Sequence, residues 1–499
     1  MTQKQTYHDI NAPEPLLNII PSYYQDDIEN LFQTWNNVRQ RNRVLSNYYD
    51  MHNTLKELGI SIPEGMLNVN CAVGWASKAV KAVATRSVFD GYVFKGEEEP
   101  NLAAMVRKNR LKSLYRAAVK SSLIHGVSAF TVMRKNPNSN EVKVRAYSAH
   151  QFAVLHDKDN DCVKCGIVCA DVDNEGNAIK YVAHFPKSVL TITRPAGTNN
   201  WSCEEEPNPL ERPMMEVLVY DKDLDRPFGH SLLTPEILGT IDKGMRDILR
   251  MEVGAEFFTY PQRYVLGAAD SLFCEIPEGC EEDEDGNYID ADGNIVVPVP
   301  SAQKKMRAYL GALMAIGRDA NGEVPTVGQF SPGSADNFTR VFENDAQRLS
   351  GATDVPLNQL GVLSNNYTSS DALGAANNPL ILGVETMNAD NAEVLEDIAR
   401  MMVAVHDGVS FDDVPEVMDN VQAYFKDPAL PTISATADSW TKIGAVDQSI
   451  VGTEVWYESM GIPQATIQRI FAQKEQADAI ATLNAIAEGL TNQSLTVEG

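Results

Sequence analysis

Two helical segments on either side of a long irregular insert constrain the fold of this chain more than any other feature. The first helix begins near Pro235, since proline is tolerated in the first helical turn, and it must end before Pro261. The second spans 335–349, and Gly351 is expected to stop it. The insert between them, 263–333, contains proline and glycine throughout. Neither helix is long enough to bury its apolar face alone, so the pair requires a partner surface.

Each of these helices carries a stripe of basic residues along one face. Spacings of three and four residues place side chains on the same side of a helix, where they can contact passing phosphates without reading base sequence. The alternative is a solvated face, or one paired with the nearby carboxylates of Asp242, Asp247 and Glu252. The stripes are Lys243, Arg246 and Arg250 on the first helix, and Arg340, Asn344 and Arg348 on the second.

The charge balance of the chain is strongly acidic. It has 68 acidic and 42 basic residues, a formal net charge of −26, whereas a tight nucleic-acid binder normally presents a basic surface. A channel through which DNA slides is not excluded, because each phosphate contact raises affinity and would hinder sliding. The simpler interpretation is that the charge only keeps the protein soluble.

Three features of the sequence bear on the compartment in which the protein folds. It has no run of about 18 apolar residues, so we expect no transmembrane helix. Its N-terminal segment, MTQKQTYHDINAPEP, lacks a basic stretch followed by an apolar one, so we expect no secretion signal. The seven cysteines are therefore expected to be reduced, cytosolic thiols.

The apolar periodicity predicts an α+β chain. Helical spacing occurs over 25–47, 66–85 and 102–125. After Gly126 the period changes to two, and short apolar runs between turn residues predict strands at 127–134, 142–147, 152–156, 165–171, 178–185 and 217–220. Later segments predict a helix over 370–406 that Pro379 kinks or interrupts, a strand at 421–426, and helices at 436–459 and 463–488.

The insert contains a segment close to the Ca²⁺-loop pattern of an EF-hand, with alternating acidic residues followed by glycine. Its flanks, 275–279 and 296–300, are rich in proline and cannot form the helices of that motif. An exposed acidic hairpin with Asp-Gly turns fits better, and a weak Ca²⁺ or Mg²⁺ site is left open as an alternative. The acidic residues are Glu281, Asp283, Asp285, Asp290 and Asp292.

The cysteines at 162, 165 and 169 raise the question of a zinc site. Structural zinc needs four ligands, usually as two pairs, and the nearby Cys203 and His184 have irregular spacing. Cys165 and Cys169 fall on one face of a predicted strand, which favours packing in the core. The sequence also lacks G-x-S-x-G, Walker A and H-E-x-x-H motifs. We therefore expect no resident metal, no cofactor, no catalytic residues and no enzymatic activity.

Several short segments, taken in order along the chain, resemble the portal proteins of tailed bacteriophages, in particular the siphophage-type head-to-tail connector. The resemblance spans roughly residues 40 to 475. The segments are Tyr48–His52, Asn68–Trp75, Arg86, Gly91–Val93, Asp225–Ser231, Ala255–Glu256, Pro261–Gly267, Leu349–Gly351, Val355–Gly361 and Ser369–Ala372.

The resemblance implies an elongated, multi-domain α+β portal fold, with long helices and a mixed β region, that assembles into a ring. On this basis the chain divides into an N-terminal arm (1–22), a wing (23–230), stem helix 1 (231–262), a clip (263–333), stem helix 2 (334–353), a tunnel loop (354–370), a kinked helix that returns to the wing (371–435) and a helical crown (436–499).

The resemblance also implies a function. A ring of about twelve copies would sit at one capsid vertex of the virion, after assembly in the host cytoplasm and without a membrane. It would form the channel for DNA packaging and ejection. Its partners would be double-stranded DNA, the terminase large subunit, the major capsid and scaffolding proteins, and head–tail adaptor proteins. The expected channel contacts are the basic stripes and the tunnel-loop residues Asn358, Gln359, Asn365, Asn366, Tyr367, Thr368 and Ser369.

The principal alternative is a metal-dependent enzyme or Ca²⁺-binding protein built around the acidic segment 281–292. Another ring-forming virion component, such as a tail adaptor, is a further alternative. Adaptors are usually much shorter than 499 residues.

Overall fold

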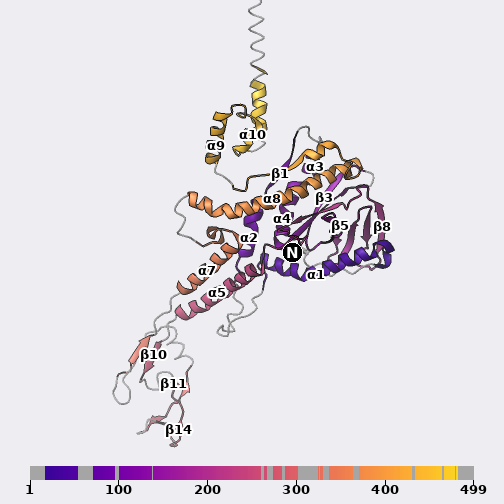
Figure 1. The fold of residues 1–499 in the computed structure, drawn as a ribbon. Coiled ribbons are helices and arrows are strands. Elements are labelled where there is room, and N and C mark those ends of the chain that lie inside the picture. Colours follow the sequence, from indigo (N-terminus) through magenta and orange to yellow (C-terminus); the bar gives the residue numbers. More distant parts are fainter. Residues whose placement is uncertain are drawn as a thin grey trace, which may run out of the picture. The chain divides into compact units, whose positions relative to one another are not determined.

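A computed structural model of the chain combines helices and antiparallel strands, so the predicted α+β class is confirmed (Figure 1). The pattern of contacts divides the chain into two compact units, 1–426 and 427–499, which are described separately below. The structure describes residues 17–53, 71–95, 101–136, 139–259, 263–266, 274–283, 287–301, 324, 326–329, 336–362, 370–429, 433–462, 466–477 and 479–480.

The first unit begins with helices whose apolar residues recur at helical spacing. Helix α1 (Gln25–Tyr49) buries Ile28, Leu31 and Trp35, which confirms the helix expected over 25–47. Helix α2 (Trp75–Ala84) is buried over most of its length. It was predicted from residue 66, but 71–74 are not helical, and 66–70 lie outside the described residues.

The single helix predicted over 102–125 is wrong, because two helices occupy that range. Helix α3 (Leu102–Asn109) and helix α4 (Leu111–His125) are separated by Arg110, whose φ of 54° is left-handed. The Asn109 side chain accepts a hydrogen bond from Val144 N at 3.0 Å and donates one to Val142 O at 3.1 Å. These bonds to a strand more than thirty residues away compensate for the interrupted helix.

Two antiparallel sheets follow in the sequence. Their strand orders are β3-β2-β9 and β4-β5-β6-β7-β8. The predicted strand at 127–134 matches β2, and the other predicted strands are found with shifted ends, but β7 and β8 were not predicted. The strands are β2 (Val127–Arg134), β3 (Val142–Ser148), β4 (Phe152–Asp157), β5 (Cys162–Val172), β6 (Ala178–His184), β7 (Ser188–Thr193), β8 (Ser202–Pro207) and β9 (Met215–Val219).

The first unit has two hydrophobic cores. One lies between α1 and the five-stranded sheet, where Tyr181 meets Phe32 and Trp35 edge-on at centroid distances of 5.4 and 6.1 Å. The other surrounds the three-stranded sheet and includes residues of α2, α4 and α8. Helix α1 packs against β4 and β5, and helices α4 and α8 pack against β2 and β3, whereas β8 at the end of its sheet is exposed (Figure 1).

Helix α8 (Ser370–Asp407) runs through the core that surrounds the three-stranded sheet. It continues through Pro379, so the predicted interruption is not found. Residues 398–405, apart from Arg400, are at most 1% exposed. The strand predicted at 421–426 is β17 (Val421–Phe425), which pairs with β1 (Phe89–Phe94), a strand that the sequence did not predict. This pairing ties the end of the first unit to its beginning.

The insert is made of short strands. Strand β10 (Arg263–Leu266) pairs with β16 (Thr326–Gln329), and β11 (Cys274–Glu275) pairs with β15 (Val299–Pro300). The acidic segment forms a meander of β12 (Glu281–Glu282), β13 (Tyr288–Ile289) and β14 (Ile295–Val296). The predicted acidic hairpin is therefore confirmed, and no residue of the flanks 275–279 and 296–300 is helical, as an EF-hand would require.

The described part of the second unit consists of helices joined by turns. The helix predicted over 436–459 is wrong, because α9 (Ile433–Val446) and α10 (Glu454–Ser459) are separate. Between them Asp447 Oδ1 accepts from Ser449 N at 3.0 Å, and Thr453 Oγ1 caps α10 by accepting from Trp456 N. Both side chains stabilise non-helical backbone. Residues 466–477 and 479–480 are helical, and 481–488 lie outside the described residues. No described helix has the length and hydropathy needed to span a membrane.

Candidate functional site

The two helices that flank the insert pack side by side and lead into it (Figure 1). They are α5 (Pro235–Thr259) and α7 (Asp336–Thr353). The expected start and end of the first helix are confirmed. The second passes Gly351 and ends at Thr353, because the residue that adopts the left-handed conformation is Asp354, with a φ of 54°. Thr353 Oγ1 also donates to Leu349 O at 2.7 Å within the last turn.

Helix α2 anchors the pair α5 and α7 to the rest of the first unit. Trp75 of α2 stacks on Phe342 of α7 at a centroid distance of 4.9 Å. On α5, Gly244 provides the space, since a Cβ at this position would lie 2.8 Å from Trp75 Cζ3. The partner surface that the sequence required is therefore α2 together with the other helix of the pair.

A buried charged cluster joins α5 to α7. The Lys243 ammonium forms an ion pair with Asp345 and lies 3.8 Å from Asp247. Arg250 also pairs with Asp247, at 2.9 Å. Asp345 is 0% exposed and Asp247 is 4% exposed. Burial raises the pKa of the Asp345 carboxyl; the hydrogen bond from Lys243 opposes this shift, and the neighbouring Asp247 adds to it.

The stripe residues predicted to contact DNA therefore fall into two groups. Lys243 and Arg250 are engaged by carboxylates of the same chain. Arg340 and Arg348 are exposed on α7, and the structure gives neither an ion pair with any described residue. Arg246 of α5, the fifth of these predicted residues, is half-buried and has no ion pair with a described residue. Sequence spacing placed all five on helix faces. It could not reveal Asp345, because that residue lies 102 positions from Lys243.

The polar loop after α7 is only partly described. Leu357–Leu360 forms the short helix η6. Asn358 is exposed, whereas Gln359 Nε2 donates to Asn377 Oδ1 of α8 at 3.1 Å. Arg86 also donates to this oxygen, at 3.5 Å. Sequence reasoning missed Asn377, although it precedes Pro379 in a polar segment. The other predicted loop residues, Asn365, Asn366, Tyr367, Thr368 and Ser369, lie outside the described residues.

The acidic residues of the insert serve turns where they are described. Asp283 Oδ1 accepts from Asn287 N at 2.7 Å, and Asp290 Oδ1 accepts from Asn294 N at 2.8 Å. The bonds from Asn294 lower the pKa of Asp290. Asp292 is exposed, and Asp285 lies outside the described residues. Within the described ranges, no three His, Cys, Asp or Glu side chains are grouped so that they could hold a metal ion.

The cysteines lie where the core interpretation placed them. Cys165 and Cys169 are at most 1% exposed in the core between α1 and the five-stranded sheet. Burial raises the pKa of each thiol to about 12. Burial therefore favours the protonated thiol of both residues, which agrees with a role in packing.

Comparison with known proteins finds relatives along nearly the whole chain. No family model matches. The portal protein of Mycobacterium phage D29 is 24% identical over 487 residues, which cover 94% of this chain and 92% of the relative. The portal protein of Mycobacterium phage L5 is 24% identical over 461 residues, covering 89% and 87%.

Solved structures with some likeness to this chain come from gene transfer agent particles. A chain of the virion of a native particle has a TM-score of 0.42 at 13% identity, over 78% of this chain and 90% of that chain. A chain of the native particle's neck, computed with C12 symmetry, has a TM-score of 0.41 at 12% identity, over 84% and 99%. TM-scores of this size do not establish a shared fold.

Proposed function

We propose that this chain, whose resemblance to phage portal proteins is borne out by two mycobacteriophage relatives, is itself a portal subunit. It forms a closed ring at one capsid vertex of the virion and surrounds the channel through which DNA is packaged and ejected. The observation that carries this proposal is sequence similarity over 94% of this chain and 92% of the D29 portal protein. Similarity of that extent covers the whole architecture rather than one shared domain.

The proposed parts of the subunit keep the boundaries expected from the sequence. Residues 23–230 form the wing, 231–262 and 334–353 the stem, 263–333 the clip, 354–370 the tunnel loop, 371–435 the return to the wing and 436–499 the crown. The packing of α5 against α7 supports the stem assignment, because the two helices share one buried charged cluster. The pairing of β10 with β16, directly beyond the helices, supports treating the insert as one clip.

The stem would contact DNA through a subset of its cations. Arg340 and Arg348 are exposed and available to phosphates, whereas carboxylates of the same chain already neutralise much of the charge of Lys243 and Arg250. A ring multiplies each exposed charge by the number of copies. A few weak phosphate contacts per subunit allow DNA to slide, since affinity rises with each contact. The tunnel loop would provide the narrowest part of the channel.

The role is structural rather than catalytic. Both curated relatives are named as portal proteins, and we propose that hydrolysis of ATP belongs to the terminase motor that docks on the clip. Capsid and scaffolding proteins would contact the wing and crown, and head–tail adaptors the clip. The alternative function built around 281–292 gains no support from the described part of the insert, whose acidic side chains bond turn backbone.

The experiment that tests this function is complementation of a phage that lacks its portal gene. Wild-type protein should restore DNase-resistant DNA in capsids. A variant without residues 363–369 should package poorly or lose its DNA after packaging. The variant Arg340→Ala/Arg348→Ala should change packaging efficiency, whereas Lys442→Ala on the second unit should not. Failure of the wild-type chain to restore packaging would contradict the proposal, and unchanged packaging and retention by the shortened loop would contradict its role in the channel.

A further inference from the structure

Two strands of the first unit leave one edge of their sheet unpaired. Strand β3 is the last strand of the order β3-β2-β9, and β8 is the last strand of β4-β5-β6-β7-β8. An unpaired edge offers backbone groups to another chain, and proteins usually cover such edges or place charges on them. Of the four strands that end these two sheets, β3 and β8 carry clusters of charges of opposite sign.

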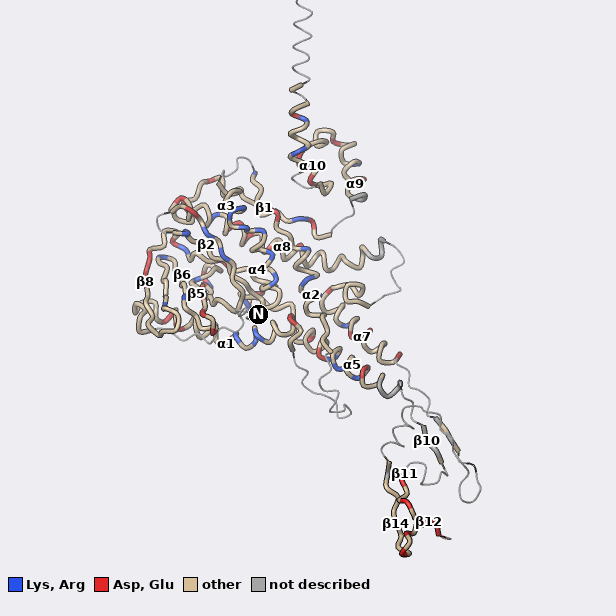
Figure 2. The backbone as a smooth tube through the Cα atoms, turned by 180° about the vertical axis from the view of Figure 1, so that it is seen from behind, with Lys and Arg blue, Asp and Glu red and all other residues tan. Residues whose placement is uncertain are grey.

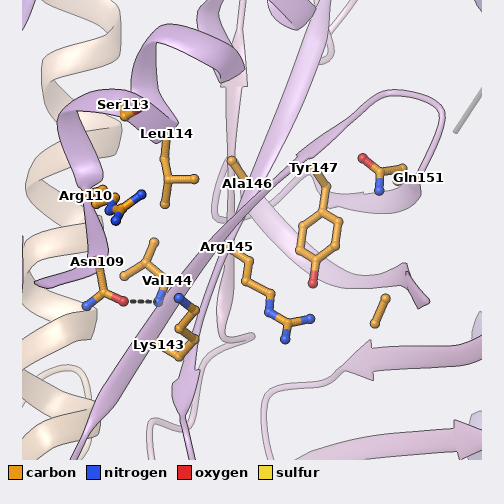
Figure 3. Close-up of a pocket in the computed structure, with 11 residues that line it drawn as sticks. Asn109, Arg110, Ser113, Leu114, Lys143, Val144, Arg145, Ala146, Tyr147 and Gln151 are labelled. Atoms are coloured by element: carbon orange, nitrogen blue, oxygen red, sulfur yellow. Dashed lines mark hydrogen bonds between the residues drawn. The ribbon is translucent and has the colours of Figure 1, made fainter. Parts of the chain in front are cut away.

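The edge at β3 is basic. Lys143 and Arg145 are exposed, and as alternate residues they share one face of the strand. With Arg110, from the junction of α3 and α4, they line a pocket of about 530 Å³ (Figure 3). None of the three has an ion pair with a described residue. In a chain with a net charge of −26, a group of unpaired cations around one strand edge is unusual.

This pocket also holds polar groups that lack partners. Tyr147 lines it and is 5% exposed, yet its hydroxyl has no hydrogen-bond partner among the described residues. The Asn109 side chain already bonds the outward backbone groups of Val142 and Val144. Backbone groups of alternate residues point outward from the edge strand of an antiparallel sheet, so the N–H and C=O of Ala146 point to the same side as the groups of Val142 and Val144 that Asn109 bonds. The pocket therefore presents three cations and one pair of backbone groups to an incoming acidic segment.

The edge at β8 is acidic. Glu204, Glu205 and Glu206 are all exposed on this strand (Figure 2). Glu205 is held by the hydroxyls of Tyr23 and Tyr24, at 2.6 and 2.9 Å. Glu204 and Glu206, on the opposite face, have no ion pair with a described residue. Their spacing of two residues matches that of Lys143 and Arg145.

The signs of the two edges decide which edges of two copies can meet. Joining β3 to β3 or β8 to β8 is disfavoured, because like charges directly opposite each other are destabilising. Two copies can join β8 of one copy to β3 of the next, because this places opposite charges across from each other. Such a contact is head-to-tail, and head-to-tail contacts close into rings when the rotation between copies permits it.

We propose that the acidic edge strand β8 of one copy docks at the basic pocket on β3 of the neighbouring copy. Glu204 and Glu206 pair with Lys143 and Arg145 across the interface, and Arg110 provides a further donor to these carboxylates. This inference rests on the proposed ring and names one contact that builds it. The competing explanation is that the charges only prevent edge strands from aggregating.

Charge reversal tests the contact. The variant Lys143→Glu/Arg145→Glu makes both edges acidic, and Glu204→Lys/Glu206→Lys makes both edges basic. Each variant alone should run near the mass of a single chain, 54.9 kDa, in light scattering. Mixing the two should restore rings, since every acidic edge then finds a basic one in an alternating arrangement. The control Lys120→Glu/Lys158→Glu changes the charge by the same amount as the β3 variant, at exposed positions away from both edges, and should assemble like the wild type.

Each other outcome contradicts the contact. If both variants assemble alone, or the mixture fails to recover rings although circular dichroism shows both variants folded, the edges do not meet. If only the β3 variant loses its rings, the pocket takes a different anionic partner and β8 is excluded. These results leave the portal function intact, whereas a wild-type chain that stays monomeric under all conditions would refute the ring and the contact together.

Discussion

Replacing Lys243 with Met should weaken the α5–α7 pair by an amount that depends on pH. The ammonium lies between two carboxylates whose side chains are 0% and 5% exposed. Removing one partner of a buried ion pair costs about 3–5 kcal/mol. The Lys243 side chain is 37% exposed, so solvent screens part of the interaction, and we expect a loss of about 2 kcal/mol in the free energy of unfolding at neutral pH.

The dependence on pH follows from Asp345. Burial raises the pKa of its carboxyl in the folded chain, and loss of the Lys243 hydrogen bond removes an interaction that lowers it. Between the ordinary pKa and the raised one, the folded chain binds more protons than the unfolded chain, so stability falls as pH rises through this window. Lowering the pH therefore protonates Asp345 in the variant and recovers part of the lost stability.

The assay is urea unfolding of both chains at about pH 7.5 and about pH 5, followed by tryptophan fluorescence, to which Trp75 beside α7 contributes. The matched control is Arg348→Met, an exposed cation on α7 that should change stability by less than about 0.5 kcal/mol. A loss no larger than that of the control would show that the cluster does not stabilise the helix pair, and an equal loss at both pH values would contradict the protonation of Asp345 in the variant.

Three further predictions concern the first unit. Gly229→Ala should cost about 2 kcal/mol or more, because φ is +63° and the new Cβ would lie 2.1 Å from Tyr220 O, whereas Gly197→Ala, with φ +75° and open space, should cost only about 1 kcal/mol; equal losses in urea unfolding would contradict the steric argument. Asn109→Ala should cost about 2 kcal/mol and speed hydrogen exchange at Val144 N, to which the side chain bonds; unchanged exchange would refute the bond. His184 is fully buried with both ring nitrogens unpartnered among the described residues, and burial lowers its pKa to about 4. Because the unfolded chain binds more protons between that value and about 6.5, the wild type should lose about 2 kcal/mol between about pH 8 and about pH 5, and His184→Leu should lack this part of the acid sensitivity.

The sequence patterns predicted those helices and strands whose limits are set by residues close by in the sequence. The alternation over 127–134 marks β2 from end to end, and the Pro235 start and Pro261 limit define α5. The break at Arg110 has no comparable local signal. It depends on Asn109 reaching β3, which is formed later in the chain. Strand β8 was missed because its exposed Ser-Cys-Glu-Glu-Glu-Pro sequence lacks the apolar alternation of a strand, and it is ordered instead by pairing with β7 and by Tyr23 and Tyr24.

The difference between signals from neighbouring residues and contacts between distant residues also explains which features of the candidate site could be predicted. Helical spacing correctly placed Lys243, Arg250, Arg340 and Arg348 on helices. It could not show which of them face carboxylates, because Asp345 is brought to Lys243 only when α7 packs on α5. Gln359 was likewise expected in a polar loop, but its bond to Asn377 requires η6 to lie against α8. Partners distant in the sequence are set by packing, which periodicity does not encode.

The central claim is that copies of this chain close into a ring around a channel. The most direct test is the mass of the purified wild-type protein by light scattering, with electron micrographs of the same fraction. We expect rings with a central hole at roughly twelve times the chain mass of 54.9 kDa. A monomer or dimer that persists at high concentration, and in the presence of capsid and scaffolding proteins, would contradict it.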